Sequence, residues 1–151
     1  MLKEDYIFFD VDVKTKEEAL RFISNQAQTL GLTDKAEGLY GDFVKREEEF
    51  STGLQDGFAI PHAKSDYAKE TAILFVSCKE NLDWETMDDK PVNYLFALIV
   101  PTTNAGNEHL MMISKLATSL LDDDFKEAVK ASTNKTQLKE YILDKMKEES
   151  V

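Results

Sequence analysis

The chain has 151 residues, the length of one ordinary domain, and its formal net charge is −11. The acidic residues are spread over both halves, which argues against a nucleic-acid or anionic-membrane partner, since either needs a basic face. The single cysteine, Cys78, excludes an internal disulfide and fits a reducing compartment. We expect residues 1–151 to form a single domain, without a signal peptide or a membrane span.

The first part of the chain predicts one strand and two helices. Aromatic and β-branched residues predict the strand, and apolar residues spaced three and four apart predict the helices. Thr15 and Glu18 form a capping box at the start of the first helix, and Gly31 ends it. The strand is predicted over residues 6–9, and the helices over 16–30 and 34–48.

The second part of the chain begins with a loop whose short apolar run, residues 58–60, leads into Pro61 and His62. Two strands and three helices are predicted to follow, and the almost continuously apolar second strand is expected to be central in the sheet. Because strands do not alternate strictly with helices, a mixed sheet covered by helices on both faces fits best. These strands are predicted over residues 71–78 and 92–100, and the helices over 107–121, 124–131 and 135–147.

His62 is the first candidate for chemistry. Pro61 fixes one backbone dihedral and withholds a donor directly before the imidazole. Gly57 and the small Ala63 allow the backbone of a partner to come close. These conditions suit a histidine that must meet the active group of another protein, and a surface-loop or packing role is the alternative.

His109 is the second candidate, in the first turn of the helix predicted over residues 107–121. A helix N-terminus presents unpaired N–H groups and a positive dipole end, which suit a phosphate. The same dipole disfavours imidazolium and leaves a neutral ring that can donate one hydrogen bond. The alternative is a half-buried histidine at a helix end.

Arg46 is the third candidate, near the end of the second predicted helix and before the Ser51–Thr52 loop. Its planar, permanently charged guanidinium suits phosphoryl oxygens, although such charge clusters are usually solvated surface. Ser51 and Thr52 can donate hydroxyl hydrogen bonds to an anion or form a turn.

Other chemistries lack their motifs. The chain has no glycine-rich phosphate loop ending in Lys-Ser/Thr, no HExxH and no cysteine pair for zinc. The two histidines lie far apart in the sequence and show no metal-ligand spacing. Cys78 and Trp84 are expected to be packed, not reactive or ligand-binding.

Taken together, these segments resemble the fructose/mannitol family of enzyme IIA domains of the bacterial phosphoenolpyruvate-dependent sugar phosphotransferase system. The segments that look like the phosphorylation site, the upstream Arg-Glu pair, the mid-domain segment and the second-histidine helix are residues 52–63, 45–47, 82–92 and 107–116. Gln55 stands where the family usually has a small residue, and Phe58 where it prefers a smaller aliphatic one.

The resemblance implies a fold, a role and a site. The fold is a three-layer α/β/α sandwich with a mixed central sheet. The role is that of a cytoplasmic phosphotransferase component without metal or organic cofactor. His62 takes a phosphoryl group from the phosphohistidine of the carrier protein HPr and passes it to a cysteine on a IIB domain, which phosphorylates sugar entering through a membrane IIC component. His109 and Arg46 stabilise the phosphate, and Thr52 and Glu108 are predicted to contribute.

Two alternatives remain open at this point. A regulatory IIA of the nitrogen-related type has the same site, but its phosphorylation state controls other proteins. A non-catalytic anion-binding or interaction module on the same fold is the alternative of a different class, because a fold does not determine function. An intact set of His62, His109 and Arg46 argues against the second.

Overall fold

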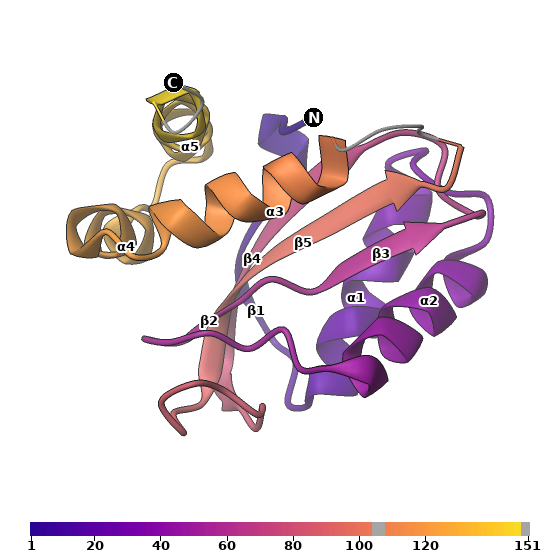
Figure 1. The fold of residues 1–151 in the computed structure, drawn as a ribbon, viewed down its shortest axis with the longest axis horizontal. Coiled ribbons are helices and arrows are strands. Elements are labelled where there is room, and N and C mark those ends of the chain that lie inside the picture. The colour runs from indigo at the N-terminus through magenta and orange to yellow at the C-terminus, as the bar shows by residue number, and fades with distance from the viewer. Residues whose placement is uncertain (104–107, 149–151) are drawn as a thin grey trace.

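The computed structural model describes residues 1–103 and 108–148, apart from the side chains of Glu108, His109 and Glu148. It shows a five-stranded sheet with helices on both faces, as Figure 1 illustrates. The helical elements are η1 (a 3₁₀ turn, Glu4–Tyr6), α1 (Lys16–Thr29), α2 (Ala36–Glu49), α3 (Glu108–Ser119), α4 (Asp123–Ala131) and α5 (Lys135–Glu148). The strands are β1 (Ile7–Val11), β2 (Phe58–Ala59), β3 (His62–Ser65), β4 (Ala72–Leu82) and β5 (Val92–Pro101).

The sheet is mixed and β5 lies in its interior. The strand order is β1-β4-β5-β2, and β3 also pairs with β5. β4 runs antiparallel to β5, whereas β1 is parallel to β4, and β2 and β3 are parallel to β5. The central position predicted for the apolar strand over residues 92–100 is therefore confirmed.

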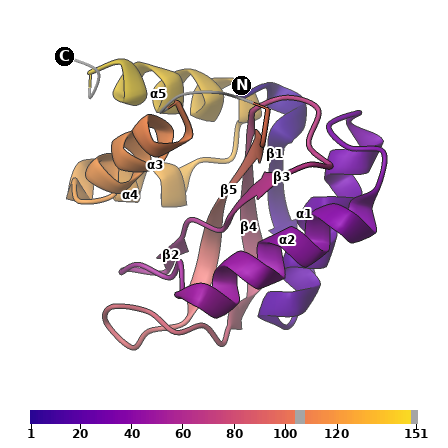
Figure 2. The same cartoon turned by 45° about the vertical axis from the view of Figure 1, so that its right-hand side comes forward.

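Three layers make up the fold. Figure 2 shows α1 and α2 on one face of the sheet and α3, α4 and α5 on the other. Buried side chains from both faces form one hydrophobic cluster, which includes the stacked rings of Phe58, Phe96 and Phe125. The predicted α/β/α sandwich with a mixed central sheet is confirmed.

Local signals placed most helix boundaries correctly. The Glu18 N–H donates to the Thr15 hydroxyl at 3.0 Å, as the predicted cap requires. Gly31 follows α1 with a φ of 77°, a left-handed conformation that glycine adopts at low cost. The capping interaction and the stop are both confirmed.

The strand β3 was not predicted. Its residues, His62 to Ser65, lack the β-branched and aromatic side chains that mark a strand. They are extended because they pair along β5, from His62 opposite Leu98 to Ser65 opposite Pro101. The pairing is non-local, so no pattern within four residues could reveal it.

Cys78 and Trp84 are packed, as predicted. Both are buried, and burial raises the pKa of the Cys78 thiol to about 11. The Lys16 ammonium lies 5.0 Å from the centre of the Trp84 ring.

Within the described residues, no helix is both long and apolar enough to cross a membrane.

Candidate functional site

His62 begins β3, directly after a break in a strand ladder. Phe58 pairs with Tyr94 and His62 pairs with Leu98, so β2 and β3 follow β5 in the same register. Pro61 lies between them and has no N–H with which to continue the hydrogen bonding. The proline therefore divides one ladder into two short strands immediately before the histidine.

The Pro61 carbonyl accepts the Leu98 N–H of β5 at 2.9 Å, whereas Ile60 points away from β5 and its carbonyl is available to the histidine ring. The Ile60 N–H donates to the Thr52 carbonyl at 3.0 Å, and the Ile60 carbonyl lies 3.0 Å from Nδ1 of His62. A carbonyl can only accept, so Nδ1 carries a proton in this arrangement. The lone pair of a neutral, half-buried His62 ring then resides on Nε2.

The alternation along β3 determines which face of the sheet His62 occupies. The Ser65 hydroxyl donates to Asp42 on α2, so Ser65 points to the face covered by α1 and α2. Side chains three residues apart on a strand point to opposite faces. His62 therefore points to the face covered by α3, α4 and α5.

His109 and Glu108 belong to the first turn of α3, which lies on that same face. Their backbones agree with the predicted helix start. Their side chains lie outside the described residues, so their roles toward a phosphoryl group stay predictions.

The resemblance implies that Arg46 stabilises a phosphoryl group on His62, which requires its guanidinium to approach the imidazole. Its Nη1 donates to the Phe50 carbonyl at 2.7 Å, which caps the end of α2. Because α2 covers the face opposite His62, the guanidinium must reach round the edge of the sheet at β3 to approach the imidazole. Its role toward the phosphoryl group also stays a prediction.

Thr52 is bound to the Glu47 carboxylate, a contact that was not predicted. Its hydroxyl donates to the Glu47 carboxylate, and its N–H lies 3.0 and 3.1 Å from the two carboxylate oxygens. A hydroxyl has one hydrogen, so in this arrangement Thr52 cannot also donate it to a phosphate. The sequence signal for a buried Glu47 is its place in the apolar stripe of α2, one turn after Phe43 and two turns after Leu39.

The carboxylates of Asp56 and Asp88 stabilise the turn that precedes β2 through hydrogen bonds. Asp56 and Gly57 adopt left-handed φ values of 58° and 88°. The Asp56 N–H donates to Asp88 at 3.0 Å, and the Asp56 carboxylate accepts from Lys126 of α4. The hydrogen bond from Lys126 lowers the pKa of Asp56 and raises that of Lys126, and the bond from the Asp56 N–H lowers the pKa of Asp88.

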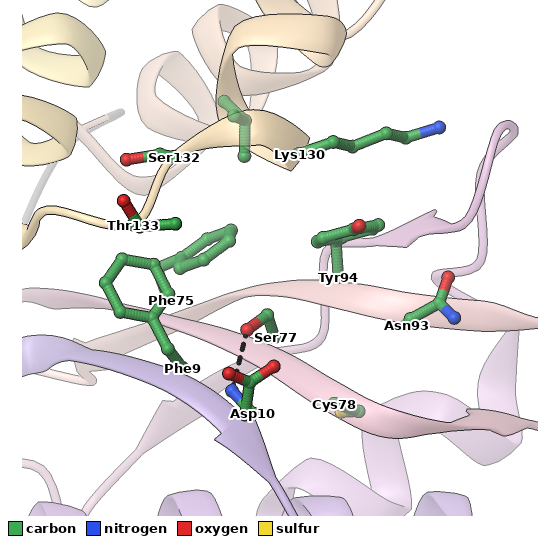
Figure 3. Close-up of a pocket in the computed structure, with 11 residues that line it drawn as sticks. Phe9, Asp10, Phe75, Ser77, Cys78, Asn93, Tyr94, Lys130, Ser132 and Thr133 are labelled. Atoms are coloured by element: carbon green, nitrogen blue, oxygen red, sulfur yellow. Dashed lines mark hydrogen bonds between the residues drawn. The ribbon is translucent and has the colours of Figure 1, made fainter.

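A cavity of about 260 Å³ lies elsewhere, between the sheet and the end of α4 (Figure 3). Asp10 and Tyr94 line it, and the Asp10 N–H donates to the Ser77 hydroxyl at 3.0 Å. Of the predicted site residues whose side chains the structure describes, His62, Arg46 and Thr52, none lines it. No group of three or more His, Cys, Asp or Glu side chains in the described part of the chain could hold a metal ion.

The sequence matches one protein family over almost its whole length. The profile described as "Phosphoenolpyruvate-dependent sugar phosphotransferase system, EIIA 2" matches residues 1–145. The "PTS system fructose-specific EIIA component" of Haloferax volcanii is 32% identical over 130 residues, which cover 86% of this chain and 84% of that protein.

Longer relatives contain the same region. The "PTS system 2-O-alpha-mannosyl-D-glycerate-specific EIIABC component" of Escherichia coli is 28% identical over 142 residues, which cover 93% of this chain. The matched region is only 22% of that protein, and 20% of the fructose-specific EIIABC component of Bacillus subtilis. The chain therefore spans about a fifth of these multidomain relatives.

Solved structures show the same fold. The nitrogen regulatory protein IIA-Ntr of Neisseria meningitidis superposes with a TM-score of 0.85 at 27% identity, covering 93% of this chain and 95% of that one. The crystal structure of IIA mannitol from Escherichia coli gives a TM-score of 0.75 at 23% identity, covering 97% and 99%. Given the profile match and the Haloferax relative, the chain belongs to the EIIA 2 family of the phosphoenolpyruvate-dependent sugar phosphotransferase system.

Proposed function

We propose that this chain is a phosphohistidine carrier in which His62 accepts a phosphoryl group from phospho-HPr and passes it to a IIB domain. The observation that carries the proposal is the contact of 3.0 Å between Nδ1 of His62 and the Ile60 carbonyl. This contact keeps the proton on Nδ1, so that Nε2 is the nucleophile.

The transfer balances without a further reactant. The Nε2 lone pair attacks phosphorus, and the donor's P–N bond breaks as the new one forms, so the donor imidazole recovers that electron pair. His62 keeps its Nδ1 proton, and its ring gains positive charge, which the Ile60 carbonyl stabilises by accepting the N–H. A positively charged ring is a good leaving group, which favours the onward step to a IIB cysteine.

Charge on the phosphoryl group, about −2 at neutral pH, needs compensation. Arg46 supplies a guanidinium and His109 a ring N–H at the start of α3, where the helix dipole also favours an anion. Glu108 belongs to the same helical turn. Thr52 contributes its hydroxyl only if it leaves Glu47, and otherwise supports the site through its backbone.

Similar proteins that contain or bind a IIB part support the proposed acceptor. Two relatives are EIIABC components, in which EIIA is joined to B and C parts. A structure with the same fold, at a TM-score of 0.78 and 22% identity, is the complex of IIA mannitol with phosphorylated IIB mannitol from Escherichia coli. A IIB domain is therefore the proposed acceptor, and the resemblance to the enzyme IIA domains implies HPr as the donor.

Reconstitution with purified components tests the proposal. The chain is incubated with phosphoenolpyruvate, enzyme I and HPr, and its intact mass is measured. We expect the mass to increase by one phosphoryl group, with an acid-labile and base-stable linkage, and we expect His62→Ala to remain unlabelled. Full labelling of His62→Ala, or no labelling of the wild type, would overturn the proposal.

A regulatory role is the second candidate. The observation that favours it is the TM-score of 0.85 with IIA-Ntr of Neisseria meningitidis. The same phosphorylated protein distinguishes the two roles when IIB domains are added. Loss of label to a IIB domain supports transport, whereas stable label together with a phosphorylation-dependent protein contact supports regulation.

A further inference from the structure

A buried carboxylate lies at the start of a hydrogen-bonded path that leads to His62. Glu47, in the last turns of α2, is 8% exposed. It accepts the N–H and the hydroxyl of Thr52, and the Lys16 ammonium lies 3.7 Å from Oε2. Burying a carboxylate is unfavourable unless donors surround it, and here Thr52 and Lys16 provide them.

The path continues from Thr52 to the imidazole through two backbone groups. The Thr52 carbonyl accepts the Ile60 N–H at 3.0 Å, and the Ile60 carbonyl accepts Nδ1–H of His62 at 3.0 Å. Thr52 is therefore held on both sides of its Cα, by Glu47 at its N–H and by Ile60 at its carbonyl. One continuous path joins the buried end of α2 to the histidine at the start of β3.

We propose that Glu47 is a positioning residue for His62, acting through Thr52 and Ile60. The inference rests on the proposed function of His62 as the phosphoryl acceptor. Without Glu47, Thr52 loses the partner of its N–H and hydroxyl, and the Ile60 N–H loses its fixed acceptor. The Ile60 carbonyl then moves away from Nδ1, and the proton can reside on Nε2, where it blocks the attacking atom.

A purely structural role for Glu47 makes a different prediction. It would lower the free energy of unfolding while leaving the His62 tautomer unchanged. The tautomer is therefore the measurement that separates positioning from packing, and ¹⁵N chemical shifts of the imidazole report it directly. The measurement needs neither HPr nor IIB, so it remains informative if the proposed function fails.

The first arm compares tautomers at a pH where His62 is neutral. We expect the wild type to show the proton on Nδ1, and Glu47→Leu to show a mixture that includes the Nε2–H form. Glu47→Gln keeps one acceptor oxygen for Thr52 and should fall between them. Glu48→Gln, which changes an exposed carboxylate on the next position of α2, should match the wild type.

The second arm compares rates of labelling by phospho-HPr in a single turnover. A small misplacement of a reacting group can cost about 100-fold. We expect Glu47→Leu to slow labelling of His62 by about 10- to 100-fold, Glu47→Gln by less, and Glu48→Gln not at all. The order of the rates should follow the order of the Nδ1–H fractions.

Thr52 provides an independent pair of variants. Thr52→Ser keeps the hydroxyl that donates to Glu47, and Thr52→Val removes it at nearly constant volume. We expect Thr52→Ser to keep the Nδ1–H form and Thr52→Val to lose part of it, with slower labelling in Thr52→Val than in Thr52→Ser. If Glu47→Leu folds and keeps the wild-type tautomer and rate, the proposal is overturned. If it does not fold, identical tautomers and rates in the two Thr52 variants overturn it.

Discussion

At the scale of single residues, the candidate site depends on the Ile60 carbonyl, which lies 3.0 Å from Nδ1 of His62. The Ile60 N–H donates to Thr52, so the polar backbone groups of Ile60 point away from β5 and its carbonyl is accessible to the His62 ring. The tautomer of the neutral His62 ring therefore follows from the position of the Ile60 carbonyl. The side chains that we propose to stabilise the phosphoryl group can be tested one at a time by substitution.

Arg46 should matter more for transfer than for stability. Arg46→Ala removes one hydrogen bond to the Phe50 carbonyl, so the free energy of unfolding should fall by about 1 kcal/mol or less. The rate of labelling by phospho-HPr should fall about 10-fold or more, because a cation that compensates the phosphoryl charge is lost. Arg46→Lys keeps the positive charge but lacks the planar guanidinium, so its rate of labelling should lie between those of the wild type and Arg46→Ala. Labelling of Arg46→Ala at the wild-type rate would mean that the guanidinium only caps the end of α2 and does not contact the phosphoryl group.

His109 should act mainly in the onward step. His62 can attack without it, so His109→Gln should still be labelled by phospho-HPr. Donation to IIB should slow by about 100-fold, because a preorganised donor matters most where charge builds in the transition state. The two steps are measured separately, with phospho-HPr as donor and with IIB as acceptor. Normal donation by a stable His109→Gln variant would reduce His109 to a packing residue.

At the scale of elements, a tight turn sets the position of β2 and thereby of β3. The carbonyl of Gly57 accepts from the N–H groups of Asn93 and Tyr94, each at 2.9 Å, at the start of β5. The turn itself is held by Asp88 from the preceding loop and by Lys126 from α4. Three separate parts of the chain therefore hold the turn at Gly57, which positions β2 and, after it, His62.

Gly57→Ala should damage both stability and labelling. Its φ of 88° disfavours any side chain, and an added Cβ would lie 2.9 Å from Oδ1 of Asn93. We expect the free energy of unfolding to fall by about 1–3 kcal/mol, measured by urea denaturation, with slower labelling of His62.

Gly31→Ala is the matched control for this change. Gly31 has a similar φ of 77°, but an added Cβ would meet nothing within 4 Å. It should cost about 1 kcal/mol from the backbone alone and leave labelling unchanged. Equal effects of both variants on labelling would show that the turn at Gly57 does not control the site.

At the scale of the whole molecule, charge links the turn at Asp56 to the C-terminal helices. The net charge of −11 favours partners with basic surfaces. Within the fold, Lys126 is buried and pairs with Asp56 and Asp123. The Lys126–Asp56 pair connects segments that lie far apart in the sequence. A change in its ionisation should therefore change the free energy of unfolding of the whole domain.

The pair predicts a window of pH in which it stabilises the fold. The pKa of Asp56 is lowered, so its contribution is present above the ordinary carboxylate pKa of about 4 and is lost as pH falls through the folded-state value. The pKa of Lys126 is raised, so its contribution is present below about pH 10.4 and is lost as pH rises through the folded-state value. Asp56→Asn should therefore be less stable than the wild type near pH 7.

Urea denaturation at several pH values checks this prediction. The difference between the wild type and Asp56→Asn should shrink as the pH falls below about 4, because protonation removes the charge from the wild type as well. Glu140→Gln, which neutralises an exposed carboxylate on α5, is the control and should show little difference at either pH. A difference between wild type and Asp56→Asn that does not depend on pH would mean that the charge of Asp56 is not what holds the turn.

The sequence by itself determined the helices, the longer strands and the family. Thr15 and Gly31 act on the backbone beside them, and a continuous apolar run such as residues 92–100 indicates a buried strand. A local pattern was therefore sufficient to predict these elements. The motif around His62 was likewise contiguous and visible. Prediction failed at β3, which has no strand signal of its own and is extended only because β5 lies beside it.

Only the tertiary structure decided how the candidate site is arranged. It directed the Thr52 hydroxyl to Glu47, placed the Arg46 guanidinium on the Phe50 carbonyl, and set the Ile60 carbonyl against the His62 ring. A sequence specifies which groups can donate and accept, but many pairings among them satisfy the same inventory. Which pairing forms depends on distances between α2, the loop and β3, and those distances exist only once the sheet has assembled.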